Sequence, residues 1–561
     1  MSHNYTGLAV SPGTGIATAF CLEGLDFESS GQTIKSEPAD KEIARLEAAR
    51  ADVGLALGEN QQDSAHQSLS LMLSEHLFHG SIIDRVKSGR TAPDAVIETV
   101  NDLKAIFGES PHPLLRERAD HAEEVGRLLL RSMLGWPLPI FFPENPVIII
   151  TEEMSAFDAA RLNPRIVSGV ICSRGGLTSH FAIIAKQIGI PVVSGIPRVM
   201  DCFRHGELCI CDGNRGVAIA SPDRQTLDAA RSRHAAEDSK AVQLSKLSRV
   251  RPTTLDGTPV NLWANIAGPG DVQAVLDAGG SGVGMFRTEF IFMGDEPPSL
   301  ERQTLIYADI LSRTPGPVVM RTLEAGGDKI IPYLAGEPEE NPNLGWQGLR
   351  MCLDTPDIFL TQLKAMIRAS CEGDLWIMFP FVSARWELDL CRGMVAQADE
   401  AVRSSGVTPG PYKVGVMIEI PSAVIMAREY LRGFDFCAVG TNDLTQFTLA
   451  ADRMNPKVSR WYDPFHPAVL RLIAMTARAA RNIPMPIGMC GDMAGNPLSI
   501  PFLLGLGFTY LSVAAPGIPE VKKTILSVDI GKSRDLVGKV LELEDSESIL
   551  SCLKDWSCGQ K

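Results

Sequence analysis

The spacing of apolar residues changes along the chain and divides it into regions of different secondary structure. Residues 1–22 are typical of a short strand segment with turn signals. From about residue 35 to residue 135 the chain is rich in helix formers, and apolar residues recur every three or four positions, as at Leu46, Ala49, Val53 and Leu57. Prolines punctuate this second stretch, so we expect several helices separated by turns.

From about residue 146 the pattern alternates between short apolar runs and helical segments. PVIIIT, RIVSGVIC, a helical segment over residues 178–189 and IPVVSG predict an α/β domain. The polar stretch from residue 221 to residue 247 follows and lacks turn residues. It predicts an exposed and stiff linker helix.

The part from residue 251 to residue 561 exceeds the roughly 250 residues of a typical eight-stranded α/β barrel by an amount that insertions can supply. Eight strand candidates follow one another, and most are apolar almost throughout, as strands buried on both faces should be: PVNLWANI, VGMFRTE, PVVMRTL, LWIMFPFV, KVGVMIEI, FCAVGTND, MPIGMCG and YLSVA. Helical segments such as DIFLTQLKAMIRAS lie between them. The pattern predicts a (β/α)8 TIM barrel.

Composition and charge indicate which classes of protein the chain can belong to. Hydrophobic residues make up 45% and charged residues 21%, as in an ordinary globular protein, and the formal charge of -14 argues against a nucleic-acid-binding surface. The longest apolar runs are too short to span a bilayer, and the first residues lack the features of a signal peptide. We therefore expect a cytoplasmic protein. Cys209 and Cys211 could suggest a metal pair, but alternating inward positions on a strand explain them better.

Polar or reactive groups stand at the ends of six of the eight predicted strands, where the active site of such a barrel lies. Glu419 and Asp443 are two carboxylates in apolar surroundings, and such a pair suits magnesium. The alternative is a structural ion pair with a nearby arginine. Cys490 ends the seventh strand and is either a buried structural cysteine or a proton donor or acceptor.

Permanent positive charge accompanies the carboxylates. Arg287 and Arg321 end adjacent predicted strands, and Arg453 follows the sixth. Their forked donors match phosphate or carboxylate oxygens, and Asn442 adds an amide donor beside Asp443. Together these residues indicate a site for a small polyanion. The glycine-containing loop of residues 324–329 is weak additional support.

A second candidate site lies in the α/β region, within SRGGLTSHFAIIAKQIGIPVVSG. Two glycines allow a tight turn before a helix, and Thr178 or Ser179 can cap that helix. His180 then lies in the first turn, where backbone amides and the helix dipole stabilise negative charge. A phosphoryl group carried on His180 would be well placed.

These motifs together resemble the phosphoenolpyruvate-utilising enzymes. GGLTSHFAIIAKQIGIPVV is similar to their phosphohistidine motif, and GVGMFRTEFIFM, RTLEAGGDK, NPNLGWQGLR, VGVMIEIPSA, GTNDLTQFTLAADR and GMCGDMAG are similar to their phosphoenolpyruvate-binding barrel, in family order. The resemblance is greatest to the enzyme I family of the sugar phosphotransferase system. It covers nearly the whole chain.

The resemblance implies an N-terminal α/β phosphohistidine domain (residues 1–22 and 143–225), an inserted helical subdomain that binds the carrier protein HPr (23–142), a linker helix (226–250) and a barrel that binds phosphoenolpyruvate and dimerises (251–561). It also implies phosphorylation on His180, transfer to an HPr-like carrier, magnesium as cofactor and a homodimer.

The resemblance further assigns roles to individual residues. Glu419 and Asp443 hold the magnesium ion, and Cys490 protonates the enolate. Phosphoenolpyruvate is gripped by several residues, namely Arg287, Arg321, Asn442, Asp443 and Arg453.

Two positions depart from the family pattern. Leu177 replaces an arginine that is frequent in enzyme I, and Glu324 stands where an aspartate is usual in RTxDxGxDK. The second departure puts the geometry of that loop in question.

Three alternatives remain. A dikinase or phosphoenolpyruvate synthase would need an ATP-binding domain, and the region before residue 146 shows no phosphate-cradling loop. A regulatory binding protein that keeps the fold would not need intact catalytic positions, yet His180 and Cys490 are both present. A regulatory, nitrogen-type phosphorelay with the same chemistry stays open.

Overall fold

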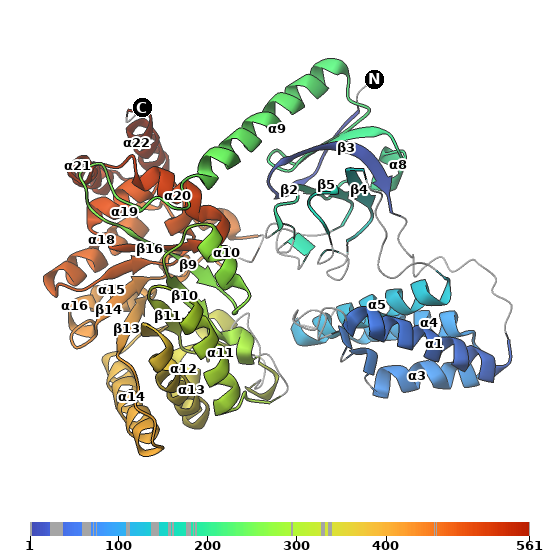
Figure 1. Ribbon diagram of the computed structural model, residues 1–561, viewed down its shortest axis with the longest axis horizontal. Helices are drawn as coiled ribbons and strands as arrows, with labels where there is room; N and C mark the ends of the chain where they lie inside the picture. The colour runs from blue at the N-terminus through green and yellow to red at the C-terminus, as the bar shows by residue number, and fades with distance from the viewer. Residues whose placement is uncertain are drawn as a thin grey trace. The chain divides into compact units, whose positions relative to one another are not determined.

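A computed structural model describes residues 3–22, 37–58, 69–107 except 71 and 75, 113–135, 145–154, 162–174, 188–292, 296–326, 331–334, 339–453 and 457–559, together with the single residues 159, 181, 182, 185 and 455. The chain divides into two compact units, residues 1–240 and 241–561 (Figure 1). Each unit contains hydrophobic cores of its own. In the described part of the chain, no helix is long and apolar enough to cross a membrane.

The first unit contains an eight-stranded sheet in the order β1-β8-β7-β3-β4-β5-β6-β2. Its strands are β1 (His3–Thr6), β2 (Leu8–Ser11), β3 (Thr14–Cys21), β4 (Val147–Thr151), β5 (Val167–Cys172), β6 (Val192–Ser194), β7 (Leu208–Asp212) and β8 (Val217–Ala220). A short helix, α8 (Val199–Cys202), lies between β6 and β7. Strand β3 pairs in parallel with β4, although more than a hundred residues separate them. The intervening helices are therefore an insertion between two neighbouring strands, as predicted.

Those helices are α1 (Ala39–Gly58), α3 (His76–Lys87), α4 (Ala92–Phe107) and α5 (Pro113–Met133). They bury a core of their own, which includes the residues of α1 whose spacing predicted a helix. Figure 1 shows the four helices packed together (blue and cyan). The prediction of several helices in this stretch is confirmed.

Strand β7 carries Cys209 and Cys211, and both side chains are fully buried. The Cys209 thiol contacts the carbonyl oxygen of Ala17, and the Cys211 thiol contacts that of Val170, each at 3.5 Å. Burial raises the pKa of both thiols well above the ordinary range. The interpretation of this pair as inward positions on a strand is confirmed.

The predicted linker helix is α9 (Arg224–Ser245). Its side chains bind the sheet of the first unit: Arg233 lies 3.5 Å from Asp212, and Glu237 accepts hydrogen bonds from the Thr14 backbone and the Asn214 amide. Ala230 of the helix is also buried against Ile210 and Ile219 of the sheet, so one small apolar contact accompanies the polar ones.

The second unit is a closed barrel of eight parallel strands, which confirms the predicted TIM barrel. The strands are β9 (Asn261–Ile266), β10 (Val283–Arg287), β11 (Val318–Arg321), β12 (Leu375–Phe379), β13 (Tyr412–Ile418), β14 (Phe436–Val439), β15 (Ile487–Met489) and β16 (Tyr510–Ala514). All eight predicted segments contribute one strand each.

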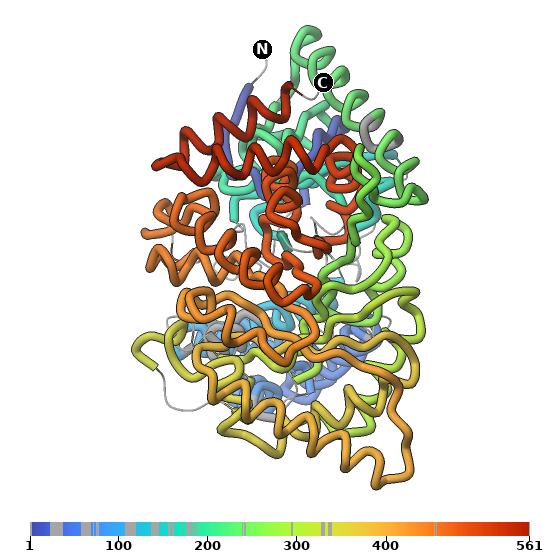
Figure 2. Tube along the Cα trace, turned by 90° about the vertical axis from the view of Figure 1, so that its left-hand side faces the viewer, coloured from blue at the N-terminus to red at the C-terminus, as the bar shows by residue number. Residues whose placement is uncertain are grey.

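Helices cover the outside of this barrel. They are α10 (Asp271–Asp277), α11 (Leu300–Arg313), α12 (Leu349–Asp354), α13 (Pro356–Ala369), α14 (Arg385–Ser404), α15 (Pro421–Ile425), α16 (Ala427–Tyr430), α17 (Thr441–Leu449), α18 (Pro467–Asn482), α19 (Ile500–Leu506), α20 (Ile518–Ile525), α21 (Ile530–Glu542) and α22 (Ser546–Cys558). The last two extend the main core and lie side by side, in the darkest red in Figure 2.

Two apolar layers hold the barrel together. Strand residues that face the helices form one large core. Strand residues of the opposite parity fill the interior with aromatic rings and sulfur-containing side chains, including Trp263 stacked on Tyr510 at a centroid distance of 4.5 Å. Cys490 belongs to this interior layer. The barrel is therefore a packed core, and polar chemistry is confined to its ends.

One predicted strand is shorter than its sequence suggested. β14 ends at Val439, and Thr441 begins α17, so Asn442 and Asp443 lie in the first turn of a helix and not at the end of a strand. Gly440 lies between the end of β14 and the start of α17. A β-carbon at this position would lie 2.6 Å from the Glu419 carboxylate and 3.0 Å from its Cβ, so the chain needs glycine for this close approach.

Candidate active site

The functional residues predicted in the barrel lie where its strands end. Arg321 is the last residue of β11, Glu419 directly follows β13, and Cys490 directly follows β15. Asp443 lies in the first turn of α17, just after β14. Because all strands of the barrel are parallel, these side chains share its carboxyl end.

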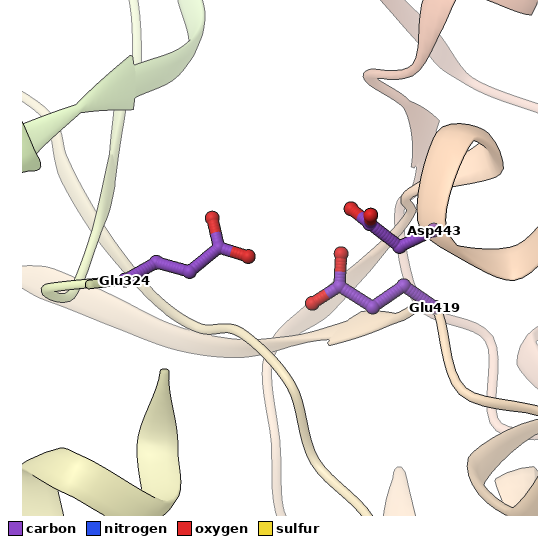
Figure 3. A group of neighbouring side chains, drawn as sticks. All are labelled: Glu324, Glu419 and Asp443. Carbon is purple, nitrogen blue, oxygen red and sulfur yellow. The ribbon is translucent and has the colours of Figure 1, made fainter. Parts of the chain in front are cut away.

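Three carboxylates converge at this end. Glu324, Glu419 and Asp443 each offer one oxygen, and the three oxygens lie within 4.8 Å of one another. Figure 3 shows the Glu324 side chain pointing from the segment after β11 toward Glu419 and Asp443, which face it from the opposite side. The two carboxylates predicted from sequence are thus joined by a third that had been noted only as a departure from a motif.

Glu419 is the most deeply buried member of this carboxylate triad, with 1% of its surface exposed. One carboxylate oxygen accepts a hydrogen bond of 2.6 Å from the backbone N–H of Phe381, and the other, Oε2, has no hydrogen-bond partner in the described part of the chain. Burial, reinforced by the charges of Glu324 and Asp443, raises the Glu419 pKa well above its ordinary value. A buried acid of this kind is stable as a carboxylate only beside a positive charge.

Phe381 supplies its N–H from a strained backbone. It follows β12 with a φ of 56°, in the left-handed region that a bulky side chain rarely adopts. The ring is enclosed by Phe447 at a centroid distance of 5.7 Å and by the Arg350 guanidinium at 5.0 Å. This packing holds the N–H toward Glu419, and sequence alone offered no signal for it.

Arg321 lies beside the triad and is only 4% exposed. It donates to Glu289 at 2.7 Å and forms a second ion pair with Glu324. Burial opposes its charge, but the neighbouring carboxylates outweigh burial and raise the pKa of Arg321. An ion pair of the kind considered as the alternative for Glu419 and Asp443 is present here, but its carboxylates are those of Glu289 and Glu324, and Glu419 Oε2 has no hydrogen-bond partner among the described residues.

Glu289 itself is 1% exposed and belongs to the RTE sequence that ends the second predicted strand. The sequence placed it near the site without assigning it a role. Its signal was an acid two residues after the end of an apolar strand, because an isolated carboxylate in such a position needs a buried cation.

Cys490 is held by its backbone at the top of the interior layer. Its carbonyl oxygen accepts a hydrogen bond of 3.2 Å from the Asn265 amide, and Ser512 in turn donates to Asn265 at 2.6 Å. Burial, followed by the charge of Glu419, raises the pKa of the Cys490 thiol to about 12. The sulfur therefore carries a proton at neutral pH, as a proton donor must.

The remaining barrel residues lie around this centre. Arg287 ends β10 with an exposed side chain, and its charge acts on Cys490. Asn442 accepts a hydrogen bond of 3.0 Å from the Asp492 backbone. The Arg453 side chain hydrogen-bonds Tyr462, whose hydroxyl group also contacts the Asn442 carbonyl oxygen at 3.3 Å.

Two predicted features cannot be placed. The segment that carries His180, its glycine pair and its capping hydroxyls lies outside the described residues, as does Lys329 of the loop after Glu324.

The carboxylate triad fits a hard divalent cation. Its donors are all oxygen atoms, one of them is buried without a hydrogen-bond partner among the residues that the structure describes, and Arg321 contributes one positive charge beside three acids. Asp443 and Glu419 can thus hold a metal ion, with Glu324 within reach.

The buried thiol leads to a testable contrast in reactivity. In EDTA at pH 8, iodoacetamide should alkylate the exposed Cys371 and Cys558 at least about tenfold faster than Cys490, because only the thiolate reacts and burial keeps Cys490 protonated. Peptide mass spectrometry over time measures the three rates. Equal labelling of Cys490 in the folded protein would show that the thiol is accessible and ionised.

Comparison with known proteins shows the family to which the chain belongs. Three family descriptions match in chain order: "PEP-utilising enzyme, N-terminal" over residues 6–118, "PEP-utilising enzyme, mobile domain" over 143–216 and "PEP-utilising enzyme, PEP-binding domain" over 241–530. The third covers the barrel whose carboxyl end carries the triad, and it spans more than half of the chain.

Curated relatives extend the match to the whole chain. A phosphoenolpyruvate-protein phosphotransferase of Priestia megaterium is 36% identical over 99% of both chains, and one of Bacillus subtilis is 35% identical over 98% of this chain and 99% of its own. A multiphosphoryl transfer protein of Rhodobacter capsulatus is 39% identical over 81% of this chain and 55% of its own. The chain therefore belongs to the PEP-utilising enzymes, and within them to the phosphoenolpyruvate-protein phosphotransferase family.

Proposed function

We propose that this chain is an active phosphoenolpyruvate-protein phosphotransferase that phosphorylates His180 and passes the phosphoryl group to a histidine of an HPr-like carrier. The observation that carries the proposal is the group of side chains gathered at the carboxyl end of the barrel. It consists of the carboxylate triad, Arg321 beside it and the protonated thiol of Cys490. Phosphoryl transfer is mainly a matter of positioning and charge neutralisation, and this set is suited to both.

The substrate roles follow from the chemistry of the side chains. Three arginines provide forked donors for the phosphate and carboxylate of phosphoenolpyruvate, namely Arg287, Arg321 and Arg453. The side chains of Asn442 and Asp443 also contact the substrate. Glu419 and Asp443 would hold Mg2+, which when bound neutralises charge on the phosphate oxygens.

The reaction breaks the bond between phosphorus and the enol oxygen and forms a bond between phosphorus and a ring nitrogen of His180. The enolate of pyruvate then takes a proton at carbon from the Cys490 thiol, and the resulting thiolate recovers a proton from solvent. The raised pKa of Cys490 keeps the thiol protonated before the step, so that a proton is present to donate, and it makes the thiolate basic enough to recover a proton from solvent afterwards.

The family resemblance also supports proposals about organisation. His180 belongs to a phosphohistidine domain of residues 1–22 and 143–225, residues 23–142 bind the carrier, and residues 226–250 link them to the barrel of residues 251–561. His180 must reach both donor and carrier, so we expect a large swing about the segment near residues 221–260. One identical structure for the donor-docked and carrier-docked states would exclude it. The protein is proposed to be a cytoplasmic homodimer.

The first experiment is incubation of the purified protein with phosphoenolpyruvate and Mg2+, followed by intact mass and pyruvate assays. We expect an acid-labile, phosphoryl-sized mass gain together with pyruvate release, and neither in His180→Ala. No pyruvate and no mass gain in the parent protein would favour a regulatory binding protein. Phosphoryl transfer from the loaded protein to sugar-type or nitrogen-type carriers would then separate sugar uptake from a regulatory relay.

A further inference from the structure

The Glu324 carboxylate lies close to both a positively charged and two negatively charged side chains. It forms an ion pair with Arg321, and it also belongs to the carboxylate triad with Glu419 and Asp443. A carboxylate has two oxygens, so one can serve the arginine while the other faces the triad. Figure 3 shows the Glu324 side chain extended toward the other two acids.

The acidic side chains around Glu324 outnumber the arginine that contacts them. The carboxylates of Glu289, Glu324, Glu419 and Asp443 all act on the single charge of Arg321. Arg321 contacts one oxygen of Glu289 and forms an ion pair with Glu324, whereas Glu419 Oε2 is buried and has no hydrogen-bond partner in the part of the chain that is described. Buried carboxylates without compensation are costly and are neutralised by a proton or by a cation, and a divalent cation at this point would compensate all three acids of the triad at once.

Magnesium sites that depend on substrate phosphate usually have one or two protein carboxylates. Here the longer side chain of Glu324 brings a third to within 4.8 Å of the others. We propose that Glu324 is a ligand of the divalent cation, and that this chain binds the cation before phosphoenolpyruvate arrives. Through its ion pair, Glu324 also links the occupied cation site to Arg321. The proposal deepens the proposed function and rests on it for the identity of the substrate.

The test is a titration of the full-length protein with Mn2+ in the absence of phosphoenolpyruvate. The electron paramagnetic resonance signal of free Mn2+ measures binding, and competition with Mg2+ shows whether Mg2+ takes the same site. The parent should bind one Mn2+ per chain. Glu324→Gln should weaken this binding by at least about tenfold, since affinity depends on the number of charged ligands. Glu419→Gln should abolish it, which shows that the titration reports this site.

Glu289→Gln is the matched control. It removes the same charge from the same arginine, but Glu289 is not part of the triad. Mn2+ affinity in this variant should stay within about threefold of the parent. Circular dichroism and melting temperature show whether each variant is folded.

Two results would overturn the proposal. Equal effects of Glu324→Gln and Glu289→Gln would make Glu324 only a counterion of Arg321, and a parent protein that binds no Mn2+ without substrate would exclude early binding. Because the titration contains neither phosphoenolpyruvate nor carrier, its failure leaves the phosphorylation assay unaffected, and failure of phosphorylation does not change the titration.

Discussion

Glu419→Gln should slow phosphoenolpyruvate-dependent phosphorylation of the protein by about 10²- to 10³-fold, because the charge stabilisation by a bound metal is worth several kcal/mol and each 1.4 kcal/mol is tenfold in rate. Glutamine keeps the volume of the side chain, and its oxygen can still accept the hydrogen bond from Phe381 N–H. The substitution removes only the charge of this carboxylate, whose Oε2 has no hydrogen-bond partner among the described residues and faces the proposed cation site.

Rapid-quench measurement of phosphoprotein, at saturating phosphoenolpyruvate and several Mg2+ concentrations, gives the rate. Glu429→Gln, an exposed position on α16, is the control and should react like the parent. A Glu419→Gln protein that is folded and reacts at the parent rate would show that Glu419 does not hold the metal ion. Recovery of the rate at very high Mg2+ would instead place the whole effect in cation affinity.

Arg321→Met should lower the free energy of unfolding of the barrel by about 3–5 kcal/mol, the usual cost of removing one partner of a buried ion pair. Glu289 is buried and receives a 2.7 Å contact from this arginine, and Glu324 is its second partner. With methionine both acids lose their compensating charge while packing volume is largely kept. Urea unfolding followed by tryptophan fluorescence measures the change, since Trp263 and Trp376 lie in the barrel interior.

The double variant Arg321→Met/Glu289→Gln tests whether the uncompensated charge of Glu289 causes the loss of stability. It should be more stable than Arg321→Met alone, because it no longer buries an unpaired Glu289 charge. Arg302→Met, at an exposed position on α11, controls for the loss of one positive charge. If Arg321→Met unfolds like this control, the pair with Glu289 contributes little to stability, and Arg321 is retained only for substrate binding.

The barrel and the end at which its chemistry lies were predictable because the relevant signals are local. Eight apolar segments of strand length, separated by helical periodicity, leave few other folds, and parallel strands bring the residues that follow them to one edge. Glu419 and Cys490 were found in this way, since each directly follows a strand. Asp443 was found for a partly wrong reason, because the strand before it ends at Val439 and Asp443 belongs to α17.

The sequence by itself determined the barrel, the helices between residues 35 and 135, the polar helix that follows β8 and the set of acids and arginines at the barrel's carboxyl end, because each depends on periodicity or position within one element. Only the tertiary structure decided which acid contacts the arginine and which carboxylates lie together. Glu289, Arg321, Phe381 and Glu419 come from four different strand ends, and the contacts among them depend on barrel closure and on side-chain length. The extra methylene of Glu324 illustrates the point: in sequence it was a small departure from a motif, whereas in the fold it places a third carboxylate at the proposed cation site.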